Sequence, residues 1–156
     1  MYNIAFNDSS QTLAKRVFLC YCSQDRFAAE RLQVHLAGCQ HLYHLSVWDI
    51  THLPAGSIWQ SELTIVLASA QIAVVLISAD FLADTHIINH QLPSLLEAAQ
   101  NKGTRILPVI LGSCLFEESL LRIFLPINPK QPLKRLSPGK RDEVWVAVVR
   151  TIASYM

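Results

Sequence analysis

The stretch RVFLCYCSQDRFAAERLQVHLAGC, residues 16–39, sets the pattern on which the fold depends. Its opening RVFLCYC is a short apolar and aromatic run of the kind that forms a buried strand. The rest has the spacing of a helix, with Ser23 placed as its N-cap and Gly38 near its end. A buried strand that leads directly into a helix is typical of an α/β fold.

The same alternation continues along the chain. QIAVVLIS is the most apolar run and is predicted to form a central strand. Strands that alternate with helices predict a doubly wound parallel sheet with helices on both faces. We expect one domain over residues 16–156 after a polar lead-in at residues 1–15. The further predicted strands are 45–49, 71–78 and 104–111, and the further predicted helices are 57–70, 85–103 and 142–155.

Composition excludes several classes of function. The residues are 51% hydrophobic and 16% charged, and the net charge of +1 argues against direct nucleic-acid binding. No apolar run reaches the roughly 18–20 residues of a membrane-spanning helix, and the N-terminus has no secretory pattern. The four cysteines form no CxxC pair. We therefore expect a cytoplasmic protein with no membrane contact, no metal centre and no bound cofactor.

The carboxyl ends of the predicted strands define the candidate site, because ligands of such sheets bind outside those ends. This edge collects Tyr21 to Ser23, Trp48 with Asp49, and Ser78 to Asp80. The sequence contains no GxGxxG, no GxxxxGK[ST] and no GxSxG, which excludes the usual dinucleotide, triphosphate and serine-hydrolase motifs. The acidic cluster of a phosphoacceptor receiver domain is also missing after the first strand.

Four segments in order resemble a TIR domain of the bacterial type. VFLCYCSQDRFAAERLQVHL is similar to the first box of the family, and VWDITHLPAGSIWQSEL is similar to its second strand and BB loop. ASAQIAVVLISADFLAD and QLPSLLEAAQNKGTRILPVIL complete the central part. The resemblance implies a flavodoxin-like sheet of five parallel strands. For many bacterial members it also implies cleavage of NAD+, as a substrate, at the nicotinamide–ribose bond.

The resemblance assigns the catalytic position to Gln91. Bacterial relatives carry a glutamate there, within Glu-Leu-Pro, whereas this chain reads Gln91-Leu92-Pro93. A carboxylate stabilises the oxocarbenium-like transition state of such a cleavage, and the amide keeps its shape without its charge. The chain is either an engineered inactive variant, which we favour because the rest of the site is intact, or a natural pseudoenzyme. We expect Gln91 in a partly solvated first turn of its helix.

Further site residues follow from the strand ends and from the resemblance, and each has a plainer interpretation. Ser23 also suits a helix N-cap, Trp48 also suits the core, and Arg26 suits an exposed helix surface. The loop ITHLPAGSIW is expected to mediate assembly through Pro54, Gly56 and Trp59. The expected substrate-binding residues are Tyr21, Ser23, Arg26, Trp48, Asp49 and Asp80.

The leading hypothesis is a TIR effector domain that cleaves NAD+ to nicotinamide and linear or cyclic ADP-ribose in anti-phage defence. The resemblance implies other TIR domains as partners, in a homo-oligomer or filament, together with a fused or separate sensor module. The main alternative is a TIR module that assembles without chemistry. A third alternative is a nucleoside-processing enzyme with a related sheet.

Overall fold

Four parallel strands form the centre of the molecule in a computed structural model that describes residues 15–52 and 55–156. The sheet order is β2-β1-β3-β4. Every residue of β3 is buried, and β3 lies between β1 and β4, which confirms the prediction of a central strand. The bounds are Lys15–Cys20 for β1, Leu45–Asp49 for β2, Ile72–Ile77 for β3 and Arg105–Ile110 for β4.

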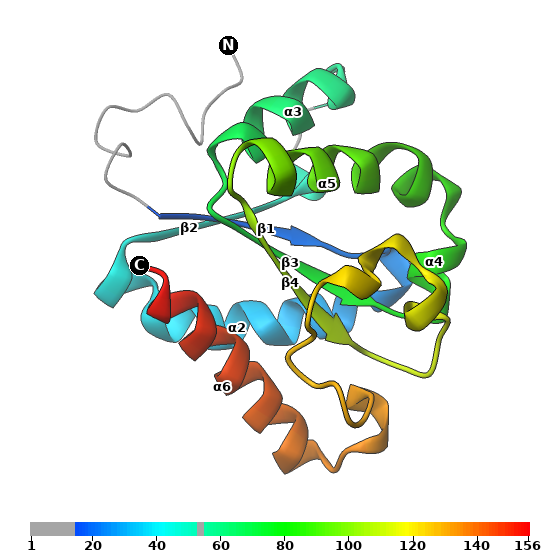
Figure 1. Cartoon of the computed structure of the whole chain (residues 1–156). Coiled ribbons are helices and arrows are strands. Elements are labelled where there is room, and N and C mark those ends of the chain that lie inside the picture. The colour runs from blue at the N-terminus through cyan, green and yellow to red at the C-terminus, as the bar shows by residue number, and fades with distance from the viewer. Residues whose placement is uncertain (1–14, 53–54) are drawn as a thin grey trace.

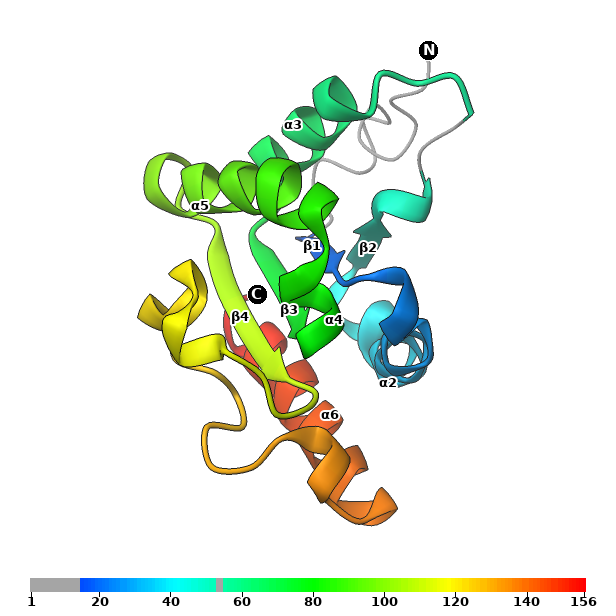
Figure 2. The same cartoon turned by 90° about the vertical axis from the view of Figure 1, so that its right-hand side faces the viewer.

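Helices cover both faces of the sheet, as Figures 1 and 2 show. One face carries α2 (Arg26–Tyr43) and α6 (Pro138–Ser154), and the other carries α3 (Trp59–Ser69) and α5 (Leu92–Asn101). A short helix, α4 (Ala79–Ala83), follows β3. Successive strand residues point to opposite faces. In β1, Val17 and Leu19 pack in the core beneath α2 and α6, whereas Phe18 and Cys20 pack beneath α3 and α5.

The expected fifth strand is absent from the described residues. The segment after β4 forms three 3-10 turns instead, and its prolines lack the N–H that a strand ladder needs. The edge of β4 is closed differently: Ile127 N–H donates to the Pro108 oxygen at 2.9 Å, and the Asn128 amide bonds both the N–H and the C=O of Ile110. The turns are Phe116–Glu118, Leu120–Ile123 and Leu133–Arg135.

The first long helix has different ends from those predicted. A 3-10 turn, Ser23–Asp25, precedes α2, and the Ser23 hydroxyl donates to Gln24 Oε1 at 3.2 Å, so Ser23 does not cap α2. The helix continues past Gly38 to Tyr43, and His44, which follows it, has a left-handed φ of 53°. Across residues 15–52 and 55–156, no helix has the length and apolar character of a membrane span.

Candidate active site at the carboxyl edge of the sheet

Gln91 lies in a π-helical turn, Ile87–Gln91, that leads directly into α5. The N–H of Leu92 donates to the Ile87 oxygen, one residue further back than in an α-helix. Pro93 explains the wider turn: it has no N–H, and its ring would collide with the carbonyl four residues before it in a regular helix. The sequence Gln-Leu-Pro therefore fixes the local backbone that carries Gln91. Such turns occur often at functional sites.

The Gln91 side chain is buried, with 4% of its surface exposed. The Cys20 thiol, at the carboxyl end of β1, donates to Gln91 Oε1 at 3.5 Å. Burial raises the pKa of Cys20, which keeps this thiol protonated as a weak donor. The expectation of a partly solvated first turn is wrong, because helical residues begin at Thr85 and the π-turn directs Gln91 toward the sheet.

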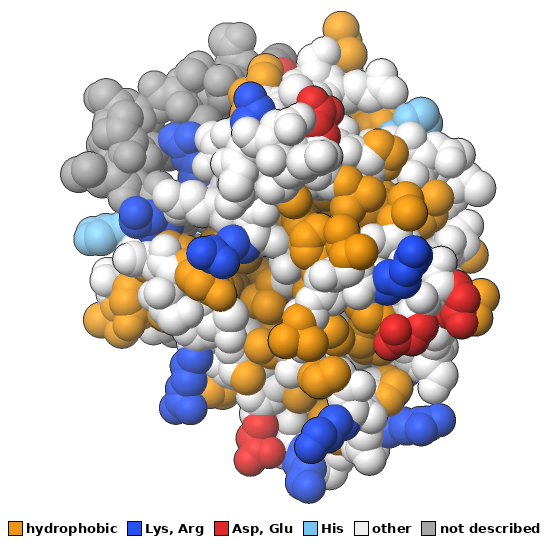
Figure 3. Space-filling view, in the orientation of Figure 1, with side chains coloured by type: hydrophobic (Ala, Val, Ile, Leu, Met, Phe, Trp, Pro, Cys, Tyr) orange, Lys and Arg blue, Asp and Glu red, His pale blue; other side chains and the backbone are white. Residues whose placement is uncertain are grey.

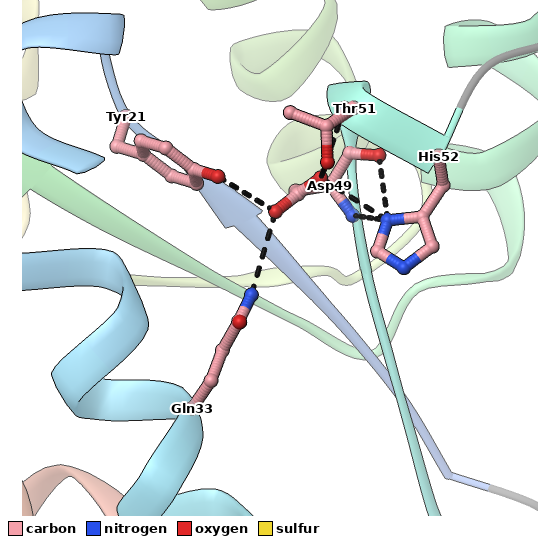
Figure 4. Close-up of polar contacts among 5 residues, drawn as sticks. All are labelled: Tyr21, Gln33, Asp49, Thr51 and His52. Carbon is pink, nitrogen blue, oxygen red and sulfur yellow. Dashed lines mark hydrogen bonds and ion pairs between the residues drawn. The ribbon is translucent and has the colours of Figure 1, made fainter. Parts of the chain in front are cut away.

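A second polar cluster surrounds Asp49 at the end of β2 (Figure 4). The Tyr21 hydroxyl donates to Asp49 Oδ2 at 2.8 Å, and Gln33 Nε2 from α2 approaches the same oxygen at 3.4 Å. The other oxygen, Oδ1, accepts from the Thr51 N–H at 2.9 Å and from the Thr51 hydroxyl. His52 Nδ1 lies 3.1 Å from it. We call these five residues the Asp49 cluster.

The Asp49 cluster stabilises a buried negative charge. Burial alone would raise the pKa of Asp49, but hydrogen bonds from His52, Thr51 and Tyr21 outweigh it and hold the pKa at about 2. The same contact with Asp49 raises the pKa of His52. Burial and the bond to Asp49 raise the pKa of Tyr21. Asp49 is thus an anion whose acceptor capacity is already used by the protein.

The structure splits the predicted site between the two faces of the sheet. Tyr21 and Asp49 contact each other, and Tyr21 packs with the core beneath α2 and α6. Gln91 contacts Cys20, which belongs to the core beneath α3 and α5. Trp48 is 7% exposed and stacks on Phe18 with ring centroids 5.7 Å apart, which supports its interpretation as a core residue.

The remaining expected substrate-binding residues lie on the surface. Ser23 and Asp80 are exposed at the starts of their helical turns. Arg26 is also exposed, and its guanidinium lies 3.7 Å from Glu30 on the next turn of α2. These contacts fit the plainer interpretation of Arg26 as an exposed helix residue.

The expected assembly loop is described in part. Pro54 lies outside the described residues. Gly56 is exposed, and its φ of 88° is a left-handed value that favours glycine. Trp59 is the first residue of α3, and its ring packs against His86 and His90 with centroid distances of 4.4 and 5.3 Å. The ring therefore joins α3 to the helical segment that carries Gln91.

Sequence reasoning placed Cys22 and Ser78 at the candidate edge but missed Asp25, which joins them in a buried cluster between the ends of β1 and β3. Asp25 is 7% exposed, and its Oδ2 accepts from the Ser78 hydroxyl and from the Cys22 thiol at 3.0 Å. Burial and the contact with Asp25 raise the pKa of Cys22 to about 11. Ser78 Oγ also accepts the N–H of Phe81 and so caps α4. A signal for Asp25 was present in the sequence, because this carboxyl follows the first apolar strand closely, as Ser78 follows β3.

Comparison with known proteins identifies the family. A family model described as the TIR domain matches residues 17–137. No curated protein gives a significant match. Several solved structures are similar to the chain in fold, at identities too low to carry more than that.

Three of the similar structures are TIR domains. The RPS4 and RRS1 TIR domain heterodimer matches with a TM-score of 0.62 and 14% identity, over 90% of this chain and 96% of the other. The TIR domain of the Toll-related receptor TRR-2 from Hydra magnipapillata gives 0.53 and 16%, over 88% and 97%. The TIR domains of the activated Roq1 resistosome give 0.52 and 17%, over 87% and 82%. This chain belongs to the TIR domain family.

Proposed function

We propose that this TIR domain has the framework of an NAD+-cleaving enzyme, with Gln91 at the position of the catalytic glutamate. The reaction breaks the nicotinamide–ribose bond and releases nicotinamide and an ADP-ribose product. One observation carries the proposal: a polar side chain stands buried in a π-turn at the carboxyl end of β1. An apolar residue would suit the core there better, since burying a polar group costs free energy.

The chemistry explains why Gln91 leaves the chain largely inactive. As the bond to nicotinamide breaks, positive charge develops on the ribose, and a carboxylate placed beside it stabilises the transition state more than the ground state. Gln91 keeps the acceptor oxygen and the side-chain length but supplies no charge. By comparison with removal of a single electrostatic stabiliser, the loss is about 3–4 kcal/mol of barrier.

Activity also requires that Gln91 become accessible, since 4% of its surface is exposed in the single chain. We propose that assembly with other TIR domains, driven by a sensor module, opens this region. Trp59 supports the proposal, because it connects α3 to His86 and His90 on the Gln91-bearing segment. A contact that moves α3 would thus act on the turn around Gln91. Anti-phage defence remains the expected setting for such an effector.

Restoring the carboxylate tests the reaction. Gln91→Glu should release nicotinamide from NAD+ roughly 10²–10³ times faster than the present chain when both are clustered on a surface or by a fused oligomerisation module. Chromatography follows the nicotinamide. Gln100→Glu is the matched control, because it makes the same change at an exposed position of α5 and should have no effect. Adding Glu97→Gln to Gln91→Glu should leave the restored rate nearly unchanged.

A non-enzymatic assembly module is the second candidate. Its support is the neutral Gln91 together with an exposed apolar surface beside α5 and the turns after β4 (Figure 3). Four large side chains there, Leu115, Leu120, Ile123 and Leu125, are each more than 60% exposed, and exposed apolar surface of this kind often marks protein contacts. If Gln91→Glu assembles by light scattering yet releases no nicotinamide above the Gln100→Glu control, this second function replaces the first.

A further inference from the structure

A cavity of about 580 Å³ lies on the face of the sheet opposite Gln91, between α2, the end of β4 and the start of α6. This volume is within the range of small-molecule sites. Its apolar wall is formed by Ala28, Leu111, Leu133 and Trp145, with the largely exposed Phe27 beside them. The polar side chains that line it are Gln24, Asp25, Arg31, Lys134, Arg141 and Asp142.

Asp25 supplies an acceptor to this cavity. Its two described hydrogen bonds, from Cys22 and Ser78, both end on Oδ2. Within residues 15–52 and 55–156 no donor reaches Oδ1, and this oxygen is the part of the largely buried residue that can face the cavity. Oδ1 is not among the fully enclosed atoms, so it stays open to the cavity, and a ligand hydroxyl there can donate a charge-assisted hydrogen bond to it.

Lys134 and Arg141 supply positive charge. The Lys134 N–H donates to the Leu111 oxygen at 2.9 Å, which ties this residue to the end of β4. The Lys134 side chain packs alongside Gly112. A Cβ atom added to this glycine would lie 3.5 Å from Lys134 Cδ. Arg141 donates through Nε and Nη2 to the oxygens of Leu133 and Lys134 at 3.2 and 3.1 Å. The Arg141 guanidinium is therefore held by the backbone of the turn to which the exposed Lys134 belongs.

The charges leave the cavity with a positive excess. Arg31 is paired with Asp142 at 3.1 Å, so these two side chains balance each other. Lys134 and Arg141 form no ion pair within residues 15–52 and 55–156, and together they outweigh Asp25. A simple anion would satisfy the two cations but would be repelled by the Asp25 carboxylate. A ligand that suits this cavity carries an anionic group at one end and hydroxyl donors at a distance from that group.

We propose that this cavity binds a ribose phosphate compound such as a nucleoside monophosphate. The phosphate contacts Lys134 and Arg141, which are the usual partners of that group. The ribose hydroxyls donate to Asp25 Oδ1, and the base or sugar face packs on the apolar wall. Topology supports the placement, because Asp25 and Ser78 follow the two strands at which the sheet order reverses, where ligands of doubly wound sheets bind.

Titrating the unmodified chain with AMP, adenosine, ribose 5-phosphate and inorganic phosphate tests the ligand class. AMP should bind at least about tenfold more tightly than adenosine or inorganic phosphate, because a charged hydrogen bond and the hydroxyl contacts are both needed. Ribose 5-phosphate should bind between these limits. Calorimetry measures affinity, and amide NMR shifts locate the site. The shifts should centre on residues 24–28 and 133–145. No AMP binding, or shifts confined to residues around Gln91, would overturn the proposal.

Charge variants test the proposed contacts. Lys134→Gln should weaken AMP binding about tenfold while leaving adenosine binding unchanged. Lys140→Gln is the matched control, since it removes one exposed charge near the start of α6 from a residue that does not line the cavity. Asp25→Asn keeps the size of the side chain and should weaken AMP binding while phosphate binding improves. Equal AMP affinities for the two lysine variants would contradict the phosphate contact, and circular dichroism confirms that each variant folds.

Discussion

Two buried polar side chains at the carboxyl edge of the sheet, Asp49 and Gln91, differ in how many hydrogen-bond partners surround them. Asp49 is 2% exposed and Gln91 is 4% exposed, and they lie on opposite faces. Four side chains and one backbone N–H contact the Asp49 carboxylate, with the Tyr21 hydroxyl at 2.8 Å (Figure 4). The described partner of Gln91 is the Cys20 thiol at 3.5 Å.

The difference separates a structural carboxylate at position 49 from position 91, where we propose that a reactive one would act. Donors around Asp49 stabilise the anion so well that little attraction remains for a ligand cation. Around Gln91 a carboxylate would meet few donors, so its charge would be poorly stabilised until a cationic transition state formed beside it. Of the two isosteric residues, the neutral amide is the one that this apolar environment accepts more easily.

The largest effect should follow removal of Asp49. Asp49→Ala should lower the free energy of unfolding by about 3 kcal/mol, because Tyr21, Thr51 and Gln33 lose a buried acceptor together. Denaturant unfolding at neutral pH measures the loss. Asp80→Ala removes an exposed carboxyl from the first turn of α4 and should change stability by less than about 1 kcal/mol. If both variants lose the same free energy of unfolding, the Asp49 cluster does not stabilise the fold more than an exposed carboxyl does.

An intermediate effect is expected when charge is introduced at Gln91. Gln91→Glu should lower the free energy of unfolding by about 2 kcal/mol near pH 8, because the new carboxyl is buried without strong donors. Its folded-state pKa would lie above the unfolded value of about 4.3. The loss should therefore vanish below about pH 4 and grow as the pH rises. Unfolding across this range measures it.

The control for that experiment is Gln100→Glu, which places the same charge on the exposed surface of α5. Its stability should follow that of the unmodified chain at every pH. If Gln91→Glu behaves like this control, the position is open to water in solution. The Asp49 and Gln91 environments would then differ far less than the described contacts indicate.

Much of the fold could be predicted from hydrophobic patterns. The run 71–78 is apolar throughout, and β3 within it is fully buried because both faces of the sheet are covered. The number of strands could not be predicted in this way. Whether the segment after β4 joins the sheet depends on Asn128, whose side chain bonds the edge of Ile110 in place of a strand backbone.

The site could be predicted less well, for a reason visible in β1. Cys20 and Tyr21 are neighbours in sequence, so they point to opposite faces of the sheet. A fully buried strand gives no alternation of polar and apolar residues to reveal which face each side chain takes. The predicted strand ends therefore identified the correct edge of the sheet, and the structure shows Tyr21 in contact with Asp49 there. The separation of that pair from Gln91 required the structure.

The smallest effect belongs to His52, the half-exposed member of the Asp49 cluster. Asp49 stays ionised above a pKa of about 2, and its contact raises the pKa of His52. A raised folded-state pKa contributes stability that is complete below the unfolded value of about 6.5 and is lost as the pH rises through the folded value. Solvent screening at the 48% exposed side chain should keep the change below about 1 kcal/mol. Unfolding between pH 5.5 and 8.5 should show this decline in the unmodified chain and in His41→Gln, an exposed control on α2, but not in His52→Gln.

An NMR titration sharpens the comparison, because Asp49→Asn should return the pKa of His52 toward its ordinary value. A His52 pKa that ignores Asp49→Asn would mean that the two side chains are not paired in solution.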